Sequence, residues 1–184
     1  MLRPLLAPAV LLFTIAVAGC TAAPAASDGP TAQPSATGGA AASGTLPSCE
    51  AVGTALGVLI TDLPYDESAS SPSTTESYDQ RVCVFGPADG RIGVTVAAIP
   101  FLQTELDVYG QSPNAIADQR TDEHGSVLQT LVLDDAADGH LDSALYLFDL
   151  DYSITIQQSG GTVLPQLTVA AATDGAFAVR ALID

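Results

Sequence analysis

Residues 81–97 read RVCVFGPADGRIGVTVA, and this stretch decides the fold. Two of its runs, 81–85 and 92–97, are rich in Val, Ile and Phe, which is the composition of β-strands. The connection at 86–91, GPADGR, contains two glycines and a proline and is typical of a turn. The stretch therefore predicts an antiparallel hairpin.

The segment that follows the hairpin predicts a helix or a pair of helices over residues 101–119. Leu102, Leu106, Tyr109 and Ile116 mark one apolar face at helical spacing. A helix after a hairpin supplies a layer that covers the sheet.

The C-terminal part of the chain predicts further strands. Tyr152, Ile154 and Ile156 alternate with polar residues, as in a half-buried strand. Turn sequences occur at 159–162 (SGGT) and 173–175 (TDG). The extended runs are SVLQTLVL, SALYLF, YSITIQQ, VLPQLTVAAA and AFAVRALI. The last of these runs also suits a helix.

On the N-terminal side of the hairpin, residues 48–57 predict a short helix capped by Ser48 and ended by Gly57. Residues 63–79, which are rich in Ser, Pro and acids, predict an exposed loop. Together these patterns predict one α+β domain over 47–184, with one antiparallel sheet of about five or six strands and helices packed on one face.

The charge balance excludes one class of partner. The 184 residues contain 21 Asp and Glu against five Arg and no Lys, which gives a formal net charge of -16. Such a chain repels phosphate backbones, so we expect no nucleic-acid binding. Anionic lipid headgroups would repel it as well.

Residues 1–19 have the order of an export signal, with Arg3 before an apolar run and small residues at the end. The motif Val17-Ala18-Gly19-Cys20 resembles the lipobox of bacterial lipoproteins, although an ordinary secretory signal with an incidental Cys is the alternative. The resemblance implies that Cys20 carries a diacylglyceryl group, with palmitate-type chains, and becomes the mature N-terminus. Two acyl chains give stable attachment, so we expect a lipid anchor on the extracytoplasmic face of the cell membrane.

Residues 20–46 join the anchor to the domain. Between 21 and 45 all residues except Asp28 and Gln33 are Ala, Pro, Ser, Thr or Gly. This composition predicts a disordered tether that spans about 28 Å as a flexible coil.

Lipidation of Cys20 leaves two cysteines, Cys49 and Cys83, which form a pair without remainder. An oxidising exterior favours a disulfide between them. The alternative, a redox or metal-binding pair, has no Cys-x-x-Cys motif to support it.

These features together resemble the small exported lipoproteins of actinobacteria, whose domains have no assigned function. The resemblance rests on the lipobox, the tether, the Cys49 helix that ends in Ala55-Leu56-Gly57, and Cys83 in a strand. Those families often have Trp two residues after the second Cys, where this chain has Phe85. The resemblance implies no activity, cofactor or catalytic residue.

One stretch of the sequence is a weak candidate for a cation site. Residues 134–142, DDAADGHLD, match an EF-hand loop at Asp134, Asp138 and Gly139 but fail at Ala136 and Leu145. A solvated acidic turn is the simpler interpretation. We therefore predict no metal site and no cofactor.

No catalytic motif is present in the sequence: it has no Gly-x-Ser-x-Gly, no phosphate-binding loop and no His-Glu-x-x-His. His124 and His140 lie in polar stretches and are expected to be exposed. The sequence favours a non-catalytic module that binds an envelope protein or a small-molecule ligand. The alternatives are a hydrolase that uses Asp134, Asp138 and Asp149, and a spacer without a ligand.

The lipid assignment predicts that Cys20→Ala releases the protein into the medium or blocks its processing, because the acyl chains supply the attachment. Cell fractionation and immunoblotting measure the distribution. A variant that remains fully in the membrane fraction would contradict the assignment.

Overall fold

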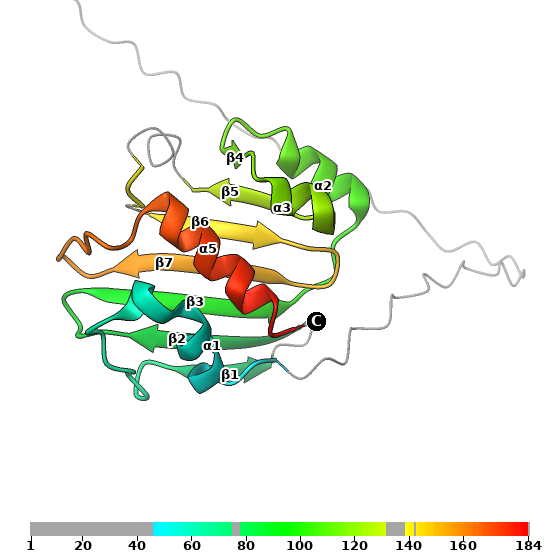
Figure 1. The fold of residues 1–184 in the computed structure, drawn as a ribbon. Helices are drawn as coiled ribbons and strands as arrows, with labels where there is room; N and C mark the ends of the chain where they lie inside the picture. Colours follow the sequence, from blue (N-terminus) through cyan, green and yellow to red (C-terminus); the bar gives the residue numbers. More distant parts are fainter. Residues whose placement is uncertain (1–45, 75–77, 132–138, 142, 184) are drawn as a thin grey trace, which may run out of the picture. The chain divides into compact units, whose positions relative to one another are not determined.

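Seven antiparallel strands form one sheet in the computed structural model, which describes residues 46–74, 78–131, 139–141 and 143–183. The α+β fold with a single antiparallel sheet is confirmed, with slightly more strands than expected (Figure 1). In the order in which they pair, the strands are β1 (Ser71–Thr74), β2 (Asp79–Phe85), β3 (Arg91–Ala98), β7 (Ser153–Ser159), β6 (Ala144–Phe148), β5 (Val127–Thr130) and β4 (Ala115–Ile116).

The pairing of β3 with β7 joins two halves of the sheet. Strands β1 to β3 form one half and β4 to β7 form the other. After β3, at the centre of the sheet, the chain therefore crosses to β4 at the far edge and returns strand by strand to β7. Helix α2 (Gln103–Gly110) lies in this connection, and α3 (Gln119–His124) connects β4 to β5. The β3–β7 register places Val94 opposite Ile156 and Val96 opposite Ile154, which aligns apolar side chains across the junction.

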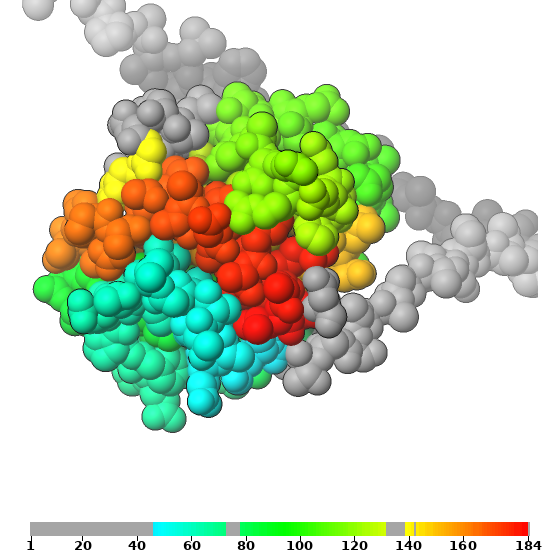
Figure 2. Space-filling view, in the orientation of Figure 1, coloured from blue at the N-terminus to red at the C-terminus, as the bar shows by residue number. Residues whose placement is uncertain are grey.

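Helices α1 (Cys49–Leu56) and α5 (Val169–Arg180), with the 3-10 helix η1 (Gly57–Ile60), cover one face of the sheet. They lie side by side, α1 in cyan and α5 in orange to red (Figure 2). Gly175 of α5 allows this close approach, because a Cβ there would lie 3.1 Å from Leu56 Cδ2 and 3.2 Å from Leu59 Cδ2.

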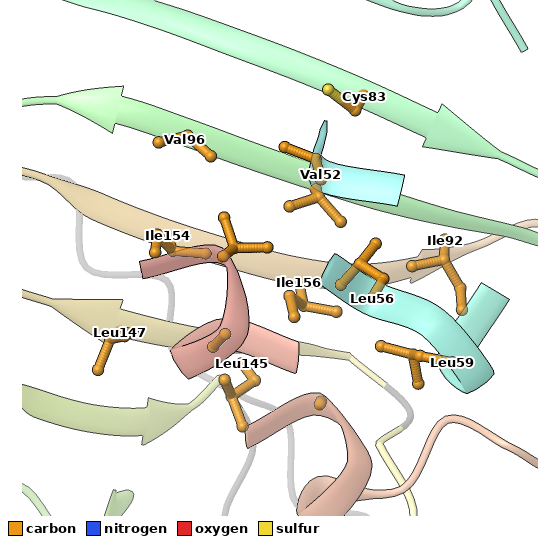
Figure 3. Close-up of a cluster of buried hydrophobic side chains, with 14 of the residues drawn as sticks. Val52, Leu56, Leu59, Cys83, Ile92, Val96, Leu145, Leu147, Ile154 and Ile156 are labelled. Carbon is orange, nitrogen blue, oxygen red and sulfur yellow. The ribbon is translucent and has the colours of Figure 1, made fainter. Parts of the chain in front are cut away.

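The hydrophobic core lies between these helices and the sheet (Figure 3). Alternate strand residues supply it, since successive side chains of a strand point to opposite faces. Its largest fully buried side chains from the strands and helices include Val52, Leu59, Ile92, Val94, Leu145, Leu147, Ile154 and Ile156.

Three segments differ from the expectation. The predicted loop at 63–79 contains β1, whose Pro72 is tolerated because the strand lies at the edge of the sheet. In the predicted helical segment 101–119, α2 is followed by turns and β4, and α3 begins only at Gln119. The turn predicted at 173–175 lies inside α5, so the C-terminal segment is a helix from Val169 onward.

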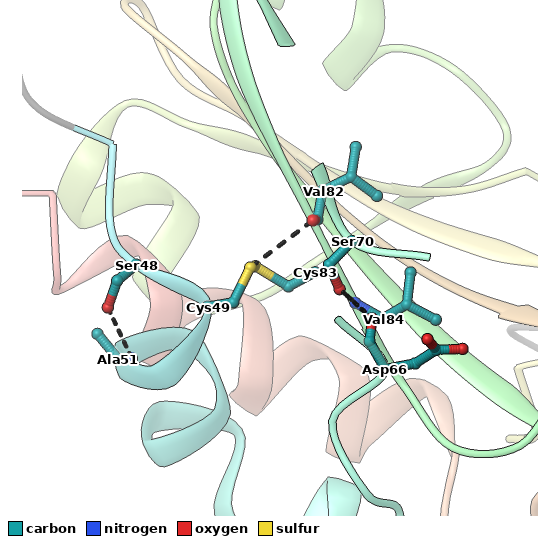
Figure 4. Close-up of a disulfide and its surroundings, with 8 residues drawn as sticks. All are labelled: Ser48, Cys49, Ala51, Asp66, Ser70, Val82, Cys83 and Val84. Atoms are coloured by element: carbon teal, nitrogen blue, oxygen red, sulfur yellow. Dashed lines mark hydrogen bonds between the residues drawn. A yellow bond between two sulfur atoms is a disulfide. The ribbon is translucent and has the colours of Figure 1, made fainter. Parts of the chain in front are cut away.

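The Cys49–Cys83 disulfide is confirmed (Figure 4). It ties the first turn of α1 to β2, and Cys49 Sγ also lies 3.6 Å from the carbonyl oxygen of Val82. Ser48 caps the helix, because its Oγ accepts a hydrogen bond from the Ala51 N–H at 3.2 Å. The start of α1 is therefore fixed by a covalent bond and by a cap.

Cys20, the leader and the tether, residues 1–45, lie outside the described residues. Within the described ranges, no helix is both long and apolar enough to cross a membrane.

Replacing both cysteines, Cys49→Ala with Cys83→Ala, should lower the free energy of unfolding by about 3 to 4 kcal/mol, because the bridge closes a long loop in the unfolded chain. Urea unfolding with and without reductant measures the loss. The reduced native protein should match the double variant, and reductant should not affect the variant. Equal stability of native and variant proteins under oxidising conditions would contradict the prediction.

Candidate functional site

The acidic stretch predicted as a possible cation site falls mostly outside the described residues, because 132–138 and 142 are not described. This includes Asp134 and Asp138. In the part of the chain that the structure covers, no three His, Cys, Asp or Glu side chains gather in a way that could hold a metal ion.

The Asp149 carboxylate is held by structural contacts. Asp149 Oδ2 lies 3.0 Å from Arg180 Nε, and Oδ1 accepts a hydrogen bond of 2.7 Å from the Leu150 N–H. Both partners of the ion pair are largely buried, with side-chain exposures of 10% and 11%. Asp149 follows the end of β6, whereas Asp151 is exposed in the turn before β7, so the two acids do not share a strand face. The Asp149–Arg180 ion pair joins this turn to α5, and Asp149 and Asp151 do not form a carboxylate dyad.

A cavity of about 690 Å³ lies between α2, α3, β4 and the start of β5. Ser126 borders it, and its buried Oγ has no hydrogen-bond partner among the described residues. His124, in contrast, is exposed at the end of α3, with its ring 6.4 Å from that of Phe177. Neither His124 nor another side chain of the described residues is hydrogen-bonded to Ser126 Oγ as a base. The residues that line the cavity include the acids Asp107 and Asp122.

The face of the sheet opposite α1 and α5 carries a row of uncharged side chains across five strands, which we call the open face row. Thr95 pairs with Thr155 at its centre, and the row continues to each side through the register of the strands. Each of these side chains is half-buried. In order across the sheet the row is Val82, Thr95, Thr155, Tyr146 and Gln129.

An aromatic cluster adjoins one end of this row. The Phe148 ring lies 5.7 Å from Tyr146, 5.5 Å from Phe101 and 4.9 Å from Tyr109, measured between ring centroids. The described strand residues that point to this face include no carboxylate, although the chain contains 21 acids. Arg91, which also belongs to this face, is paired with Asp66.

A second pocket, of about 550 Å³, opens on the helix-covered side between α1, η1 and β2. We call it the Arg81 pocket. The disulfide borders it through Cys49, and Glu50 stands at its rim. Its apolar wall consists of Gly53, Ile60, Leu63, Tyr65 and Phe85.

The Tyr65 side of this pocket is fixed by a network of backbone contacts. Tyr65 forms an isolated bridge with Phe85, and their rings lie 5.8 Å apart. Asp66 N–H donates to the Val84 carbonyl at 2.9 Å, and Ser70 Oγ accepts from the Val84 N–H at 3.0 Å. A hydrogen bond from Ser68, assisted by Ala69 N–H and Arg91, holds the pKa of the Asp66 carboxyl below its usual value.

Arg81 differs from the other arginines that the structure describes. No carboxylate of the described residues lies within ion-pair distance of its guanidinium. Its buried Nε, like that of Arg91, has no hydrogen-bond partner among these residues. The others each pair with acids: Arg91 with Asp66 at 2.9 Å, Arg120 with Asp118 at 2.8 Å and Asp174 at 3.0 Å, and Arg180 with Asp149 at 3.0 Å.

Arg81 is a candidate site residue that was not predicted from the sequence, although the strand pattern contains a signal for it. In RVCVF, strand alternation places Arg81 on the same face as Cys83 and Phe85, which is the face expected to be buried. A charged residue in that register indicates a special environment. Its lack of a partner required the structure, because the positions of the acids depend on the tertiary fold.

Comparison with models of protein families, with curated proteins and with solved structures finds no match to this chain.

Proposed function

We propose that this protein is a lipid-anchored, non-catalytic binding module on the extracytoplasmic face of the cell membrane, and that it binds a partner protein through the open face row. The observation that carries the proposal is the contrast between the uncharged open face row and a chain of net charge -16. Cores of protein interfaces are depleted of charged residues and enriched in aromatic ones.

Features of the N-terminal sequence and of the folded domain support the proposed location. The lipobox-like motif at Cys20 and the tether support anchoring, and the Cys49–Cys83 disulfide suits an oxidising compartment. The anchor and the tether would leave the domain free to meet a partner beside the membrane.

The aromatic cluster gives the proposed interface an anchor. Tyr and Phe are rigid, provide large contact areas and frequently supply much of the binding energy of an interface. Tyr146 belongs both to the cluster and to the open face row, so the two features form one continuous surface. Of the three acids named for the hydrolase alternative, Asp149 is paired with Arg180, and Asp134 and Asp138 lie outside the described residues.

The test is a photo-cross-linking residue placed at Thr95 in the anchored protein in its own cells. We expect one discrete product with a second polypeptide, and the same residue at Thr54, exposed on α1, should not give that product. Adding Thr155→Arg should lower the yield by about tenfold or more, because an unpaired charge in a desolvated interface is costly.

Two controls make the result specific. Thermal unfolding of Thr155→Arg should match that of the native protein, and Thr54→Arg should not change the Thr95 product. Equal products from Thr95 and Thr54, or an unchanged yield with Thr155→Arg, would contradict the proposal.

A further inference from the structure

We propose that the Arg81 pocket binds a small monocarboxylate with an apolar tail, with the carboxylate on the Arg81 guanidinium and the tail against Tyr65 and Phe85. The pocket lies on the opposite side of the sheet from the open face row. The inference therefore stands or falls separately from the proposed function.

The guanidinium supplies the reason for an anionic group. Arg81 is partly buried and lines the pocket, and no carboxylate of the described residues pairs with its guanidinium. A partly buried cation that lacks a counter-ion costs free energy, which an arriving carboxylate would recover. The planar guanidinium matches a carboxylate in a bidentate arrangement, so the ligand headgroup is a planar anion of this kind.

The walls supply the reason for an apolar tail. Ile60 and Leu63 extend the apolar surface that Tyr65 and Phe85 provide. Phe85 is only 3% exposed and forms the floor, whereas Tyr65 is 49% exposed and stands at the opening. A volume of about 550 Å³ falls in the ordinary range of small-molecule sites, which have mostly apolar walls and few polar groups.

Charge limits the ligand to a single negative group. Glu50 stands at the rim of the pocket, where its carboxylate is exposed, and the chain as a whole is strongly acidic. Arg81 is the one cationic residue among those that line the pocket. One cation compensates one anionic charge, and a polyanion such as a diphosphate would meet repulsion from Glu50 and from the overall charge.

The pocket is also formed in advance of binding. The disulfide fixes α1 on one side, and the hydrogen bonds of the Tyr65 segment fix the other. Gly53 maintains the space between them, because a Cβ there would lie 3.1 Å from Phe85 Cε1 and 3.5 Å from Ile60 Cδ1. A preformed site requires little ordering, which favours affinity for a small ligand.

The test uses three ligands of equal tail length, octanoate, octanamide and octylammonium, with isothermal titration calorimetry at low salt. The protein is the chain from Thr21 to Asp184, which contains all described elements and the disulfide. Octanoate should bind with a dissociation constant of about 1 mM or below, at least about tenfold more tightly than octanamide, and octylammonium should not bind measurably.

Variants show which residue contacts the carboxylate and which contacts the tail. Arg81→Gln should lower the affinity for octanoate about tenfold, to that for octanamide. The affinity of Arg81→Lys for octanoate should lie between those of the native protein and Arg81→Gln. Tyr65→Ala should weaken octanoate and octanamide equally, because it removes contact with the tail. The control Arg120→Gln makes the same change in charge away from the pocket and should not alter octanoate binding.

Three outcomes would overturn the inference. The first is that octanoate does not bind the native protein at about 10 mM, a concentration that far exceeds the expected dissociation constant. The second is that octanoate binds the native protein and Arg81→Gln equally. The third is that octanoate and octylammonium bind equally. Thermal unfolding of each variant shows that it is folded, and Tyr65→Ala, a half-exposed position, gives an independent reading if Arg81→Gln is unstable.

Discussion

The Cys49–Cys83 disulfide holds the first turn of α1 against β2, and both the core and the Arg81 pocket depend on that position. From this fixed start, α1 directs Val52 and Leu56 into the core and contacts α5. A short helix of this length is marginal by itself, so its place depends on tertiary contacts. The same bond that stabilises the fold therefore also defines one wall of the proposed ligand site.

The pairing of charges separates Arg81 from the arginines that stabilise the fold. Three of the four arginines that the structure describes are paired with carboxylates, and these pairs join loops, turns and helices to their neighbours. Arg81 is the exception, and it faces an apolar pocket. On the opposite face, the sheet presents hydroxyl, amide and aromatic groups in place of acids. The two proposed sites therefore lie on opposite sides of the sheet, one suited to a small anion and one to an uncharged protein surface.

Strand alternation predicted much of the sheet, because it reports local backbone geometry. The cysteine count predicted the disulfide. The 152–157 alternation correctly placed Ile154 and Ile156 in the core. The TDG sequence misled the prediction because Gly175 serves close helix packing and not a turn. Strand β1, SPST, forms at an edge through pairing with β2, which its own composition does not favour. The isolation of Arg81 and the open face row arise from the register of distant strands, which a linear sequence does not display.

The most direct test of the account is the two-dimensional ¹H–¹⁵N NMR spectrum of the arginine Nε–H groups during an octanoate titration. The account predicts that the Arg81 resonance, assigned by its loss in Arg81→Gln, shifts in a saturable way while those of Arg91, Arg120 and Arg180 remain in place. An Arg81 resonance that stays fixed while octanoate shifts another arginine, or shifts none, would contradict it.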